Sequence, residues 1–235
     1  MIQELIPTDL YWLMVRLPRD IKKVAETHGL MVSGGFLRAT IAGEKVSDID
    51  LFGPTKEILK MAAQEICIER KGRMFETDNA ITVLTGHRIP LQFITRWLFT
   101  DVDSLINSFD YTIAQAALFY SNGKWHGVCS DRFYPDLAAR RLHYTHPIRE
   151  EEAAGSLMRA RKFIAKGYNI QAESLAGIVA RVAMKVDWNQ IQNDEKKLTR
   201  VIAGLLREVD PLTIVDGVDI VDEHAIKIMD AGEVT

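Results

Sequence analysis

Two short motifs within residues 32–51 have residue types and spacing that suit the binding of metal ions and phosphates. Asp48 and Asp50 stand two positions apart, so both carboxylates would point to the same face if this segment forms a strand. Mg²⁺ is commonly held by one or two carboxylates together with the phosphates of a substrate. Gly34 and Gly35 precede them, and because glycine has no Cβ atom, its backbone can approach a triphosphate closely. Together the motifs predict a metal-dependent site for nucleotidyl transfer.

Both motifs also have an ordinary structural interpretation. A Ser-Gly-Gly sequence is frequently a simple turn, and a Ser-Asp-x-Asp sequence is frequently a surface loop or a helix cap. Either motif alone would be weak support for catalysis. Apolar residues flank both motifs, as buried strands would require, and this combination favours the catalytic interpretation.

The composition is that of an ordinary globular protein. The chain has 235 residues, of which 47% are hydrophobic and 26% charged, so it can bury a sizeable core. No apolar run reaches the roughly 18 residues needed to span a bilayer, and the N-terminal residues lack the basic region of a signal peptide. Cys67 and Cys129 have no nearby cysteine partner and are expected to be reduced thiols. We therefore expect a cytoplasmic protein that does not bind a membrane.

Charge is distributed unevenly along the chain. The net charge is −3, but residues 138–207 hold thirteen Lys and Arg against seven Asp and Glu. Residues 208–235 hold eight acidic residues and one Lys. The basic segment could face a polyanion such as RNA, or it could simply form solvated helix faces.

Apolar periodicity and turn residues divide the chain into helices and strands. Gly29 is expected to end a helix, and Thr55 is expected to be the N-cap of another. The predicted helices are 19–29, 55–66, 101–120, 150–166, 171–186 and 193–208, and the predicted strands are 30–33, 45–52, 66–70, 80–85 and 89–95.

These elements predict an α+β fold. A small mixed β-sheet with helices on one side would form a catalytic head over residues 1–100. An α-helical neck and body would follow over residues 101–235, ending in an acidic, partly mobile C-terminal tail.

Four motifs in order resemble a known superfamily. Gly34-Gly35 followed by Asp48-Ile49-Asp50 is similar to the signature of the DNA polymerase β-type nucleotidyltransferases. Three later segments resemble motifs in the head and neck of class II CCA-adding enzymes and bacterial poly(A) polymerases. These are 109–118 (FDYTIAQAAL), 131–142 (DRFYPDLAARRL) and 152–170 (EAAGSLMRARKFIAKGYNI). The resemblance implies a divergent, template-independent and NTP-dependent nucleotidyltransferase.

The resemblance also implies roles for particular residues. Asp48 and Asp50 would be the catalytic and metal-binding pair, holding Mg²⁺ or Mn²⁺ in a two-ion arrangement with the ions about 4 Å apart. The nucleotide, ATP or another NTP, would be bound by Ser33, Gly34, Gly35, Arg38, Asp110 and Arg159. Asp110 would lie near the sugar; alternatively it is an acid that satisfies local amides at a helix start. Arg159 would reach the triphosphate or RNA; alternatively it is a structural ion-pair partner.

The chain departs from the family pattern at several positions. Both arginines that precede the equivalent of Asp110 are absent, and the Asp and Arg that select the incoming base have no counterpart within 152–156. These departures argue against CCA addition itself. Gln92 stands on the predicted strand that usually supplies a third carboxylate in this superfamily. A neutral amide can ligate a cation weakly but cannot act as a base or neutralise it.

The sequence therefore supports one main function and two alternatives. The main prediction is transfer of a nucleoside monophosphate from an NTP to an acceptor hydroxyl, with an RNA 3′ end such as that of tRNA as the acceptor. The first alternative is a toxin-like enzyme, or one whose acceptor is a protein or a small molecule. The second is a non-catalytic descendant that binds nucleotide or RNA.

Overall fold

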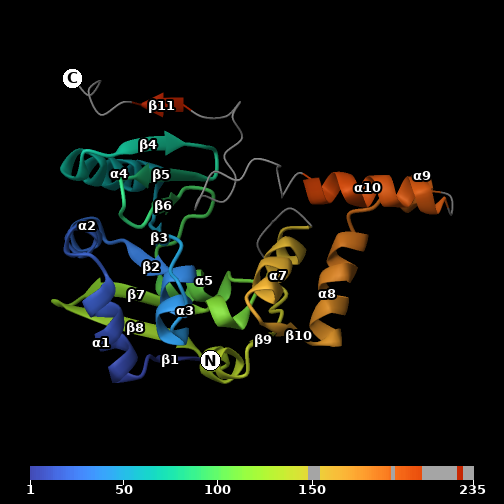
Figure 1. Ribbon diagram of the computed structural model, residues 1–235, viewed down its shortest axis with the longest axis horizontal. Helices are drawn as coiled ribbons and strands as arrows, with labels where there is room; N and C mark the ends of the chain where they lie inside the picture. The colour runs from blue at the N-terminus through green and yellow to red at the C-terminus, as the bar shows by residue number, and fades with distance from the viewer. Residues whose placement is uncertain (148–153, 192–193, 208–226, 230–235) are drawn as a thin grey trace.

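A mixed sheet forms the centre of the protein. The computed structural model describes residues 1–147, 154–191, 194–207 and 227–229. The nine-stranded sheet has the order β1-β8-β7-β2-β3-β6-β5-β4-β11 (Figure 1). Neighbouring strands are antiparallel except β3 and β6, which are parallel. The strands are β1 (Ile2–Glu4), β2 (Met31–Ser33), β3 (Ile49–Phe52), β4 (Arg73–Glu76), β5 (Ala80–Leu84), β6 (Leu91–Ile94), β7 (Ala116–Ser121), β8 (Lys124–Ser130) and β11 (Lys227–Met229).

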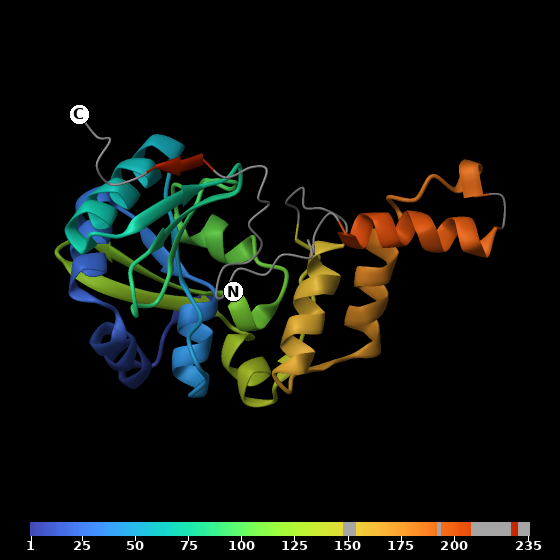
Figure 2. The same cartoon turned by 45° about the horizontal axis from the view of Figure 1, so that its top comes forward.

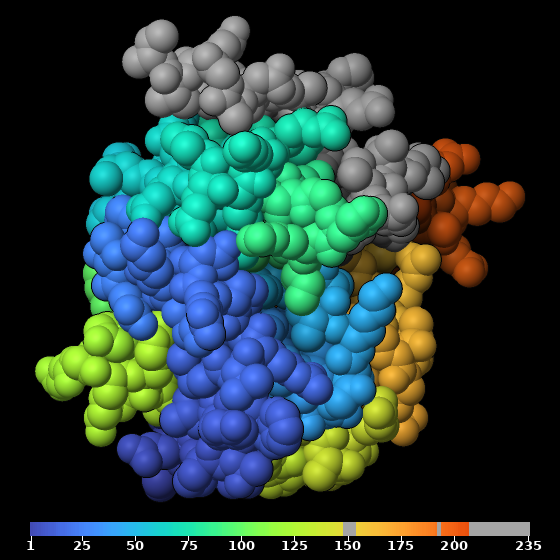
Figure 3. Space-filling model, turned by 60° about the vertical axis from the view of Figure 1, so that its left-hand side comes forward, coloured from blue at the N-terminus to red at the C-terminus, as the bar shows by residue number. Residues whose placement is uncertain are grey.

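One face of the sheet carries most of the core. Side chains alternate between the two faces along a strand, so cross-strand neighbours share a face. Val32, Leu51 and Phe93 are such neighbours on β2, β3 and β6, and all three are fully buried. The helices packed on this core are α1 (Pro7–Arg16), α2 (Arg19–His28), α3 (Gly35–Ala42) and α4 (Lys56–Arg70). The α2 and α4 helices lie side by side (Figure 3), and Arg70 donates two hydrogen bonds to Asp20 there.

The opposite face combines a polar row with a smaller apolar cluster. The polar row consists of cross-strand neighbours on β2, β3, β6 and β5, namely Ser33, Asp50, Gln92 and Thr82. In the apolar cluster, Met31 and Phe52 of the sheet pack with Leu105 and Ile106 of α5 (Val102–Asn107). Most helices next to the sheet thus lie on one side, as predicted, and α5 packs on the other.

Local sequence explains several helix boundaries. Gly29 is in the left-handed conformation (φ 64°) directly after α2, which confirms the predicted helix end. Thr55 confirms the predicted start of α4, because its hydroxyl accepts a hydrogen bond from the Ile58 backbone amide at 3.2 Å.

A helical body follows the sheet. The short segments η1 (Thr112–Ala114), α6 (Phe133–Ala138) and β9 (Arg141–Leu142) lead into α7 (Gly155–Ala165), and β10 (Asn169–Ile170) pairs in parallel with β9. The α7 and α8 (Ala172–Ala183) helices stand side by side, and α9 (Trp188–Ile191) and α10 (Glu195–Arg207) extend away from the sheet (Figure 2). The predicted α+β fold with a helical body is confirmed.

Two predicted elements are wrong. Residues 101–120 were expected to form one helix, but they form α5, the 3₁₀ turn η1 and strand β7, which lies inside the sheet. Residues 66–70 were expected to be a strand, but α4 continues through them. In both segments the spacing of the apolar residues did not separate a strand from a helix. The division of the chain at residue 100 stays a prediction, and strands on both sides of it belong to one sheet.

The acidic C-terminal segment lies largely outside the described residues. Its predicted mobility concerns 208–226 and 230–235, which are among the residues that the structure does not describe. Residues 227–229 form β11, which pairs with β4 and is the last strand of the sheet. Within the described part of the chain, no helix has both the length and the apolar character needed to cross a membrane.

Candidate nucleotidyl-transfer site

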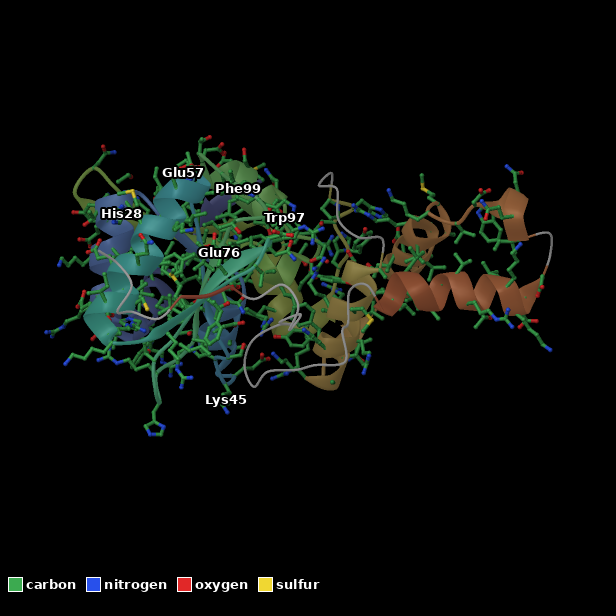
Figure 4. All side chains as sticks on the ribbon, turned by 90° about the horizontal axis from the view of Figure 1, so that it is seen from above. His28, Lys45, Glu57, Glu76, Trp97 and Phe99 are labelled. Atoms are coloured by element: carbon green, nitrogen blue, oxygen red, sulfur yellow. The ribbon has the colours of Figure 1, made fainter. Side chains whose placement is uncertain are left out.

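The paired carboxylates lie where β3 begins, beside two central strands. Asp50 is on β3, with Ser33 of β2 as its neighbour on one side and Gln92 of β6 on the other. Asp48 stands in the loop just before β3, and both aspartates are half-buried. Figure 4 shows Lys45, from the same loop, pointing outward from the molecule. The arrangement holds two carboxylates, from positions two residues apart, at the open end of a buried strand.

Each glycine of the Gly-Gly pair lies against one of these carboxylates. A Cβ atom on Gly34 would be 2.9 Å from Oδ2 of Asp50, and one on Gly35 would be 3.5 Å from Oδ1 of Asp48. Gly34 also has a φ of 78°, which side chains other than glycine rarely adopt. Glycine is therefore required at position 34 for two independent reasons: space beside Asp50 and backbone conformation.

The Gly-Gly pair also begins a helix. Gly34 is the N-cap of α3, which starts at Gly35. The first amides of a helix have no partner within it and carry partial positive charge, so they suit phosphate oxygens. Asp48 and Asp50 supply the anionic oxygens that Mg²⁺ or Mn²⁺ prefers, and the phosphates of a bound nucleotide would complete the set. The glycine cradle and the two carboxylates thus fit a cation that enters with a triphosphate.

Ser33 is placed differently from the prediction that its hydroxyl contacts phosphate. Its side chain is fully buried, and its hydroxyl donates a 2.6 Å hydrogen bond to the carbonyl oxygen of Ala116 on β7. A hydroxyl has one hydrogen to donate, so a bond from Ser33 to phosphate would require this one to break. In this structure Ser33 joins β2 to β7 directly before the glycines.

Arg38 lies in a buried charged junction between α3 and α7. Its Nε is 3.6 Å from Oε2 of Glu44, and its guanidinium lies 4.8 Å from the centre of the Phe163 ring. Glu44 also accepts hydrogen bonds from Tyr168 at 2.9 Å and from Arg140 at 3.4 Å. Burial, together with the bond donated to Glu44, raises the pKa of Tyr168 to about 12. The structure thus places Arg38 among structural partners, and its role at the triphosphate stays a prediction.

Asp110 and Arg159, both predicted to bind nucleotide, are brought together. Arg159 of α7 donates a 2.7 Å hydrogen bond from Nε to Oδ2 of Asp110, whose side chain is 4% exposed. The Asp110 backbone carbonyl accepts a hydrogen bond from the Thr145 amide. This ion pair is the structural alternative that the sequence left open for Arg159.

Gln92 occupies the position that the sequence predicted for it. It is the β6 neighbour of Asp50 in the parallel ladder and shares its face of the sheet. No cluster of three or more Asp, Glu, His or Cys side chains that could hold a metal occurs among the described residues. Within the described ranges, the two aspartates are therefore accompanied by an amide and not by a third carboxylate of a metal-binding cluster.

The sequence reasoning missed an aromatic contact at the site. Phe109 Cε1 would be 4.0 Å from a Cβ atom on Gly34, so this ring lies close to the Gly-Gly pair. Its centroid is 6.0 Å from that of Phe52, which is also 6.0 Å from Phe99. Figure 4 shows Phe99 near Trp97. Phe109 is the first residue of the motif at 109–118, but the sequence did not indicate that its ring lies beside the glycines.

A family comparison identifies the chain. The family model described as "Gabija anti-defense 2 family protein" matches residues 9–140, more than half of the 235 residues. The chain belongs to this family. The matched range of the Gabija anti-defense 2 family includes both glycines, both aspartates and Gln92, and it ends before α7. Comparison with curated proteins found no match.

Solved structures similar to this Gabija anti-defense 2 family member are nucleotidyltransferases. A Thermotoga maritima CCA-adding enzyme complexed with tRNA is 15% identical with a TM-score of 0.54, and a CCA-adding enzyme with ATP is 14% identical with a TM-score of 0.56. Both matches cover 92% of this chain and 57% of the other. A tRNA nucleotidyltransferase complexed with a primer tRNA and an incoming ATP analog is 17% identical, with a TM-score of 0.51, covering 70% of this chain and 50% of the other. At these identities the likeness establishes a nucleotidyltransferase-type fold, and the chain spans less than two thirds of these enzymes.

Proposed function

We propose that this protein is a metal-dependent nucleotidyltransferase that moves a nucleoside monophosphate from an NTP to an acceptor hydroxyl. The observation that carries the proposal is the close approach of each glycine to one carboxylate: a Cβ atom would lie 2.9 Å from Asp50 Oδ2 if placed on Gly34, and 3.5 Å from Asp48 Oδ1 if placed on Gly35. A surface turn beside a random pair of acids has no need for such a fit, whereas a triphosphate and its cation require both groups in one place.

In this proposal the aspartates bind the cation and the backbone amides position the nucleotide. Asp48 and Asp50 would hold Mg²⁺ or Mn²⁺, which when bound would neutralise charge on the phosphates. The amides that start α3 at Gly35 would bind phosphate oxygens and orient the nucleotide. The acceptor oxygen then forms a bond to the α-phosphorus while the bond from that phosphorus to the β-phosphate oxygen breaks. Pyrophosphate leaves, and the hydroxyl proton passes to solvent. Positioning and electrostatics supply most of the catalysis in such transfers.

We propose an RNA 3′ end as the first candidate acceptor. Two of the similar structures are described as complexes with tRNA, which supports an acceptor of this kind for the fold. This chain lacks the Asp and Arg that select a base in CCA-adding enzymes, which argues for a different product. Ser156 stands at one of these positions and is buried, with its carbonyl accepting a 2.6 Å hydrogen bond from Tyr111. An addition that does not follow the CCA sequence is therefore expected.

The family description favours a second candidate acceptor. The family model is described as a Gabija anti-defense 2 family protein, which supports a target within the Gabija defence system. In this version the acceptor hydroxyl belongs to a Gabija protein or to a nucleic acid that it acts on. The chemistry at Asp48 and Asp50 is the same in both versions.

One experiment tests the activity and separates the acceptors. The full chain is incubated with each α-labelled NTP and Mg²⁺ or Mn²⁺, with either total RNA or purified Gabija components. Asp48→Asn/Asp50→Asn protein is the control. Label on RNA that the control does not produce supports the first acceptor, and label on a Gabija component supports the second. Metal-dependent NTP binding without transfer to any acceptor would contradict the proposed activity and indicate a nucleotide-binding protein.

A further inference from the structure

Gln92 stands at the centre of the candidate site, yet the glycine–carboxylate mechanism does not use it. On β6 it lies beside Asp50 in the parallel ladder, and on its other side it faces Thr82 of β5. Neighbouring strands are roughly 4.8 Å apart, so the Gln92 side chain projects from the same face within reach of a group bound at Asp50.

The side chain of Gln92 is largely buried, and its amide has no hydrogen-bond partner among the described residues. The residue is 7% exposed, and within the described part of the chain its side chain forms no hydrogen bond. Buried amides in native proteins are nearly always hydrogen-bonded, to protein or to water, because leaving them unpaired is costly. Neither amide atom of Gln92 is among the fully buried, unpartnered atoms of the described residues, so the amide keeps contact with solvent beside Asp50, where water or a ligand can bond it.

The charges around this amide limit how many cations the site can hold. A pair of cations 3.5–4 Å apart, as in two-metal enzymes, needs anionic ligands for both. Here the described residues provide Asp48 and Asp50 and no third acid in a metal-binding cluster. The amide oxygen of Gln92 can contact a second cation but does not neutralise its charge, so such a cation would bind weakly.

We propose that the site binds one divalent cation together with an NTP, and that Gln92 is the residue that keeps a second cation weakly bound. This inference rests on the proposed nucleotide site. It deepens that proposal by predicting that the chain needs a higher cation concentration for transfer than for nucleotide binding. A carboxylate at position 92 would create the missing anionic ligand.

Cation binding tests the inference without depending on turnover. The full chain is titrated with Mn²⁺ in the presence of a non-hydrolysable α,β-methylene NTP analogue, and bound Mn²⁺ is counted by electron paramagnetic resonance. Wild-type protein is expected to bind one Mn²⁺ tightly. Gln92→Glu is expected to bind two, with the second at least about tenfold tighter than any second ion in the wild type, because cation affinity rises with the charge of the ligands.

A matched control makes the same chemical change elsewhere. Gln64 lies on α4, which packs on the opposite face of the sheet, so Gln64→Glu should leave the count at one. Asp50→Asn should reduce it to none. The melting temperature adds a second readout: in EDTA, Gln92→Glu should melt below wild type because its carboxylate repels Asp50, and Mn²⁺ with the analogue should reverse the difference.

The outcomes separate this inference from the proposed function. Two tightly bound cations in the wild type would overturn the inference while leaving nucleotidyl transfer intact. One cation in both wild type and folded Gln92→Glu would overturn the role given to Gln92. No cation in the wild type would contradict the metal site itself, and with it the proposed function. If Gln92→Glu does not fold, Gln92→Asp with its shorter side chain replaces it, and the wild-type count still decides the number of cations.

Discussion

Two regions of this protein hold carboxylates close to the sheet, and their surroundings differ. At the start of β3, Asp48 and Asp50 have the glycines 34 and 35 as close neighbours, where a Cβ atom would approach Asp50 to 2.9 Å. At the junction with α7, Asp110 instead receives a hydrogen bond from Arg159 at 2.7 Å. The glycine backbone approaches the carboxylates of Asp48 and Asp50 so closely that a side chain would meet them, whereas at Asp110 an arginine side chain contacts the carboxylate and offsets its charge.

The comparison sorts the residues that the sequence proposed for nucleotide binding. Asp48, Asp50 and both glycines come together in one place. Arg38, Asp110 and Arg159 lie in contacts that join the sheet to the helical body. Charged side chains in a shared motif can therefore serve either chemistry or assembly, and their immediate neighbours distinguish the two.

The largest expected effect is on the site carboxylates. Asp50→Asn should lower the rate of nucleotidyl transfer by about 10²-fold or more, because losing a preorganised electrostatic group in an active site typically has this effect. Its melting temperature should stay close to that of the wild type, since Asp50 is only half-buried. Initial rates with α-labelled NTP, measured alongside circular-dichroism melts, check both parts. A folded variant that keeps its rate would contradict the assignment of this site.

The glycines provide a sharper version of the same test. Gly34→Ala should lower transfer at least about tenfold and cost about 1–2 kcal/mol of stability, because the new Cβ meets Asp50 and the backbone has a positive φ. Gly43 is the matched control: its φ is 69°, but a Cβ atom there would meet nothing within 4 Å. The Gly43 backbone is left-handed helical (ψ 22°), whereas Gly34 (ψ −134°) lies in a region that side chains adopt still less readily, so Gly43→Ala should cost less strain and leave the rate unchanged. Equal loss of activity in both variants would show that strain, and not the space beside Asp50, matters.

Substitutions in the Asp110–Arg159 pair should change the free energy of unfolding and not the transfer reaction. A double-mutant cycle with Asp110→Asn and Arg159→Gln is expected to give a coupling free energy of about 1–2 kcal/mol, reduced from that of a fully buried pair because Arg159 is 36% exposed. Urea unfolding of the four proteins measures it. A coupling near zero, together with a raised KM for NTP in Asp110→Asn, would instead support the contact with the nucleotide sugar that the family resemblance implies.

The smallest expected effect is the pH dependence of stability that comes from Asp136 of α6. Burial acts to raise the pKa of Asp136, but hydrogen bonds from Thr112, Arg132 and Arg141 outweigh it and hold this pKa below 3.8. A carboxylate whose pKa is depressed by folding stabilises the fold at pH values above its pKa in the unfolded chain. This stabilisation is lost as the pH falls through its pKa in the folded protein. The free energy of unfolding of the wild type should therefore exceed that of Asp136→Asn by on the order of 1 kcal/mol at pH 7.

This difference should shrink as the pH falls below about 3.8, where the carboxyl of the unfolded chain and then that of the folded chain is protonated. Urea unfolding at pH 7, 5, 4 and 3 follows the change. A difference that is constant over this range would mean that the charge of Asp136 contributes nothing.

Much of the fold followed from local signals that the structure confirms. Gly29 and Thr55 marked helix ends because a left-handed cap and a side-chain cap each need particular residue types. The strand before the Gly-Gly pair and the strand with Asp50 followed from the apolar residues around each motif. The strand predicted over 89–95 is also present as β6, where Gln92 is the neighbour of Asp50, and its place as the third-carboxylate position stays a prediction.

The missed features depend on contacts between segments far apart in the sequence. Residues 116–121 read as part of a helix, yet β7 is buried between β2 and β8, and only the finished sheet makes this conformation favourable. The pairing of Asp110 with Arg159 joins residues 49 apart, and no local pattern predicts it. In the same way, nothing near Ser33 in the sequence indicates that its hydroxyl bonds Ala116.

The most direct test of the central claim is a comparison of α-labelled and γ-labelled ATP, or of whichever NTP the protein prefers, in the presence of Mg²⁺ and an acceptor. We predict that the α-label moves to the acceptor in wild-type protein, that the γ-label is released as pyrophosphate, and that Asp48→Asn/Asp50→Asn does neither. Transfer of the γ-label to the acceptor, or α-label transfer that survives loss of both aspartates, would contradict nucleotidyl transfer at this site.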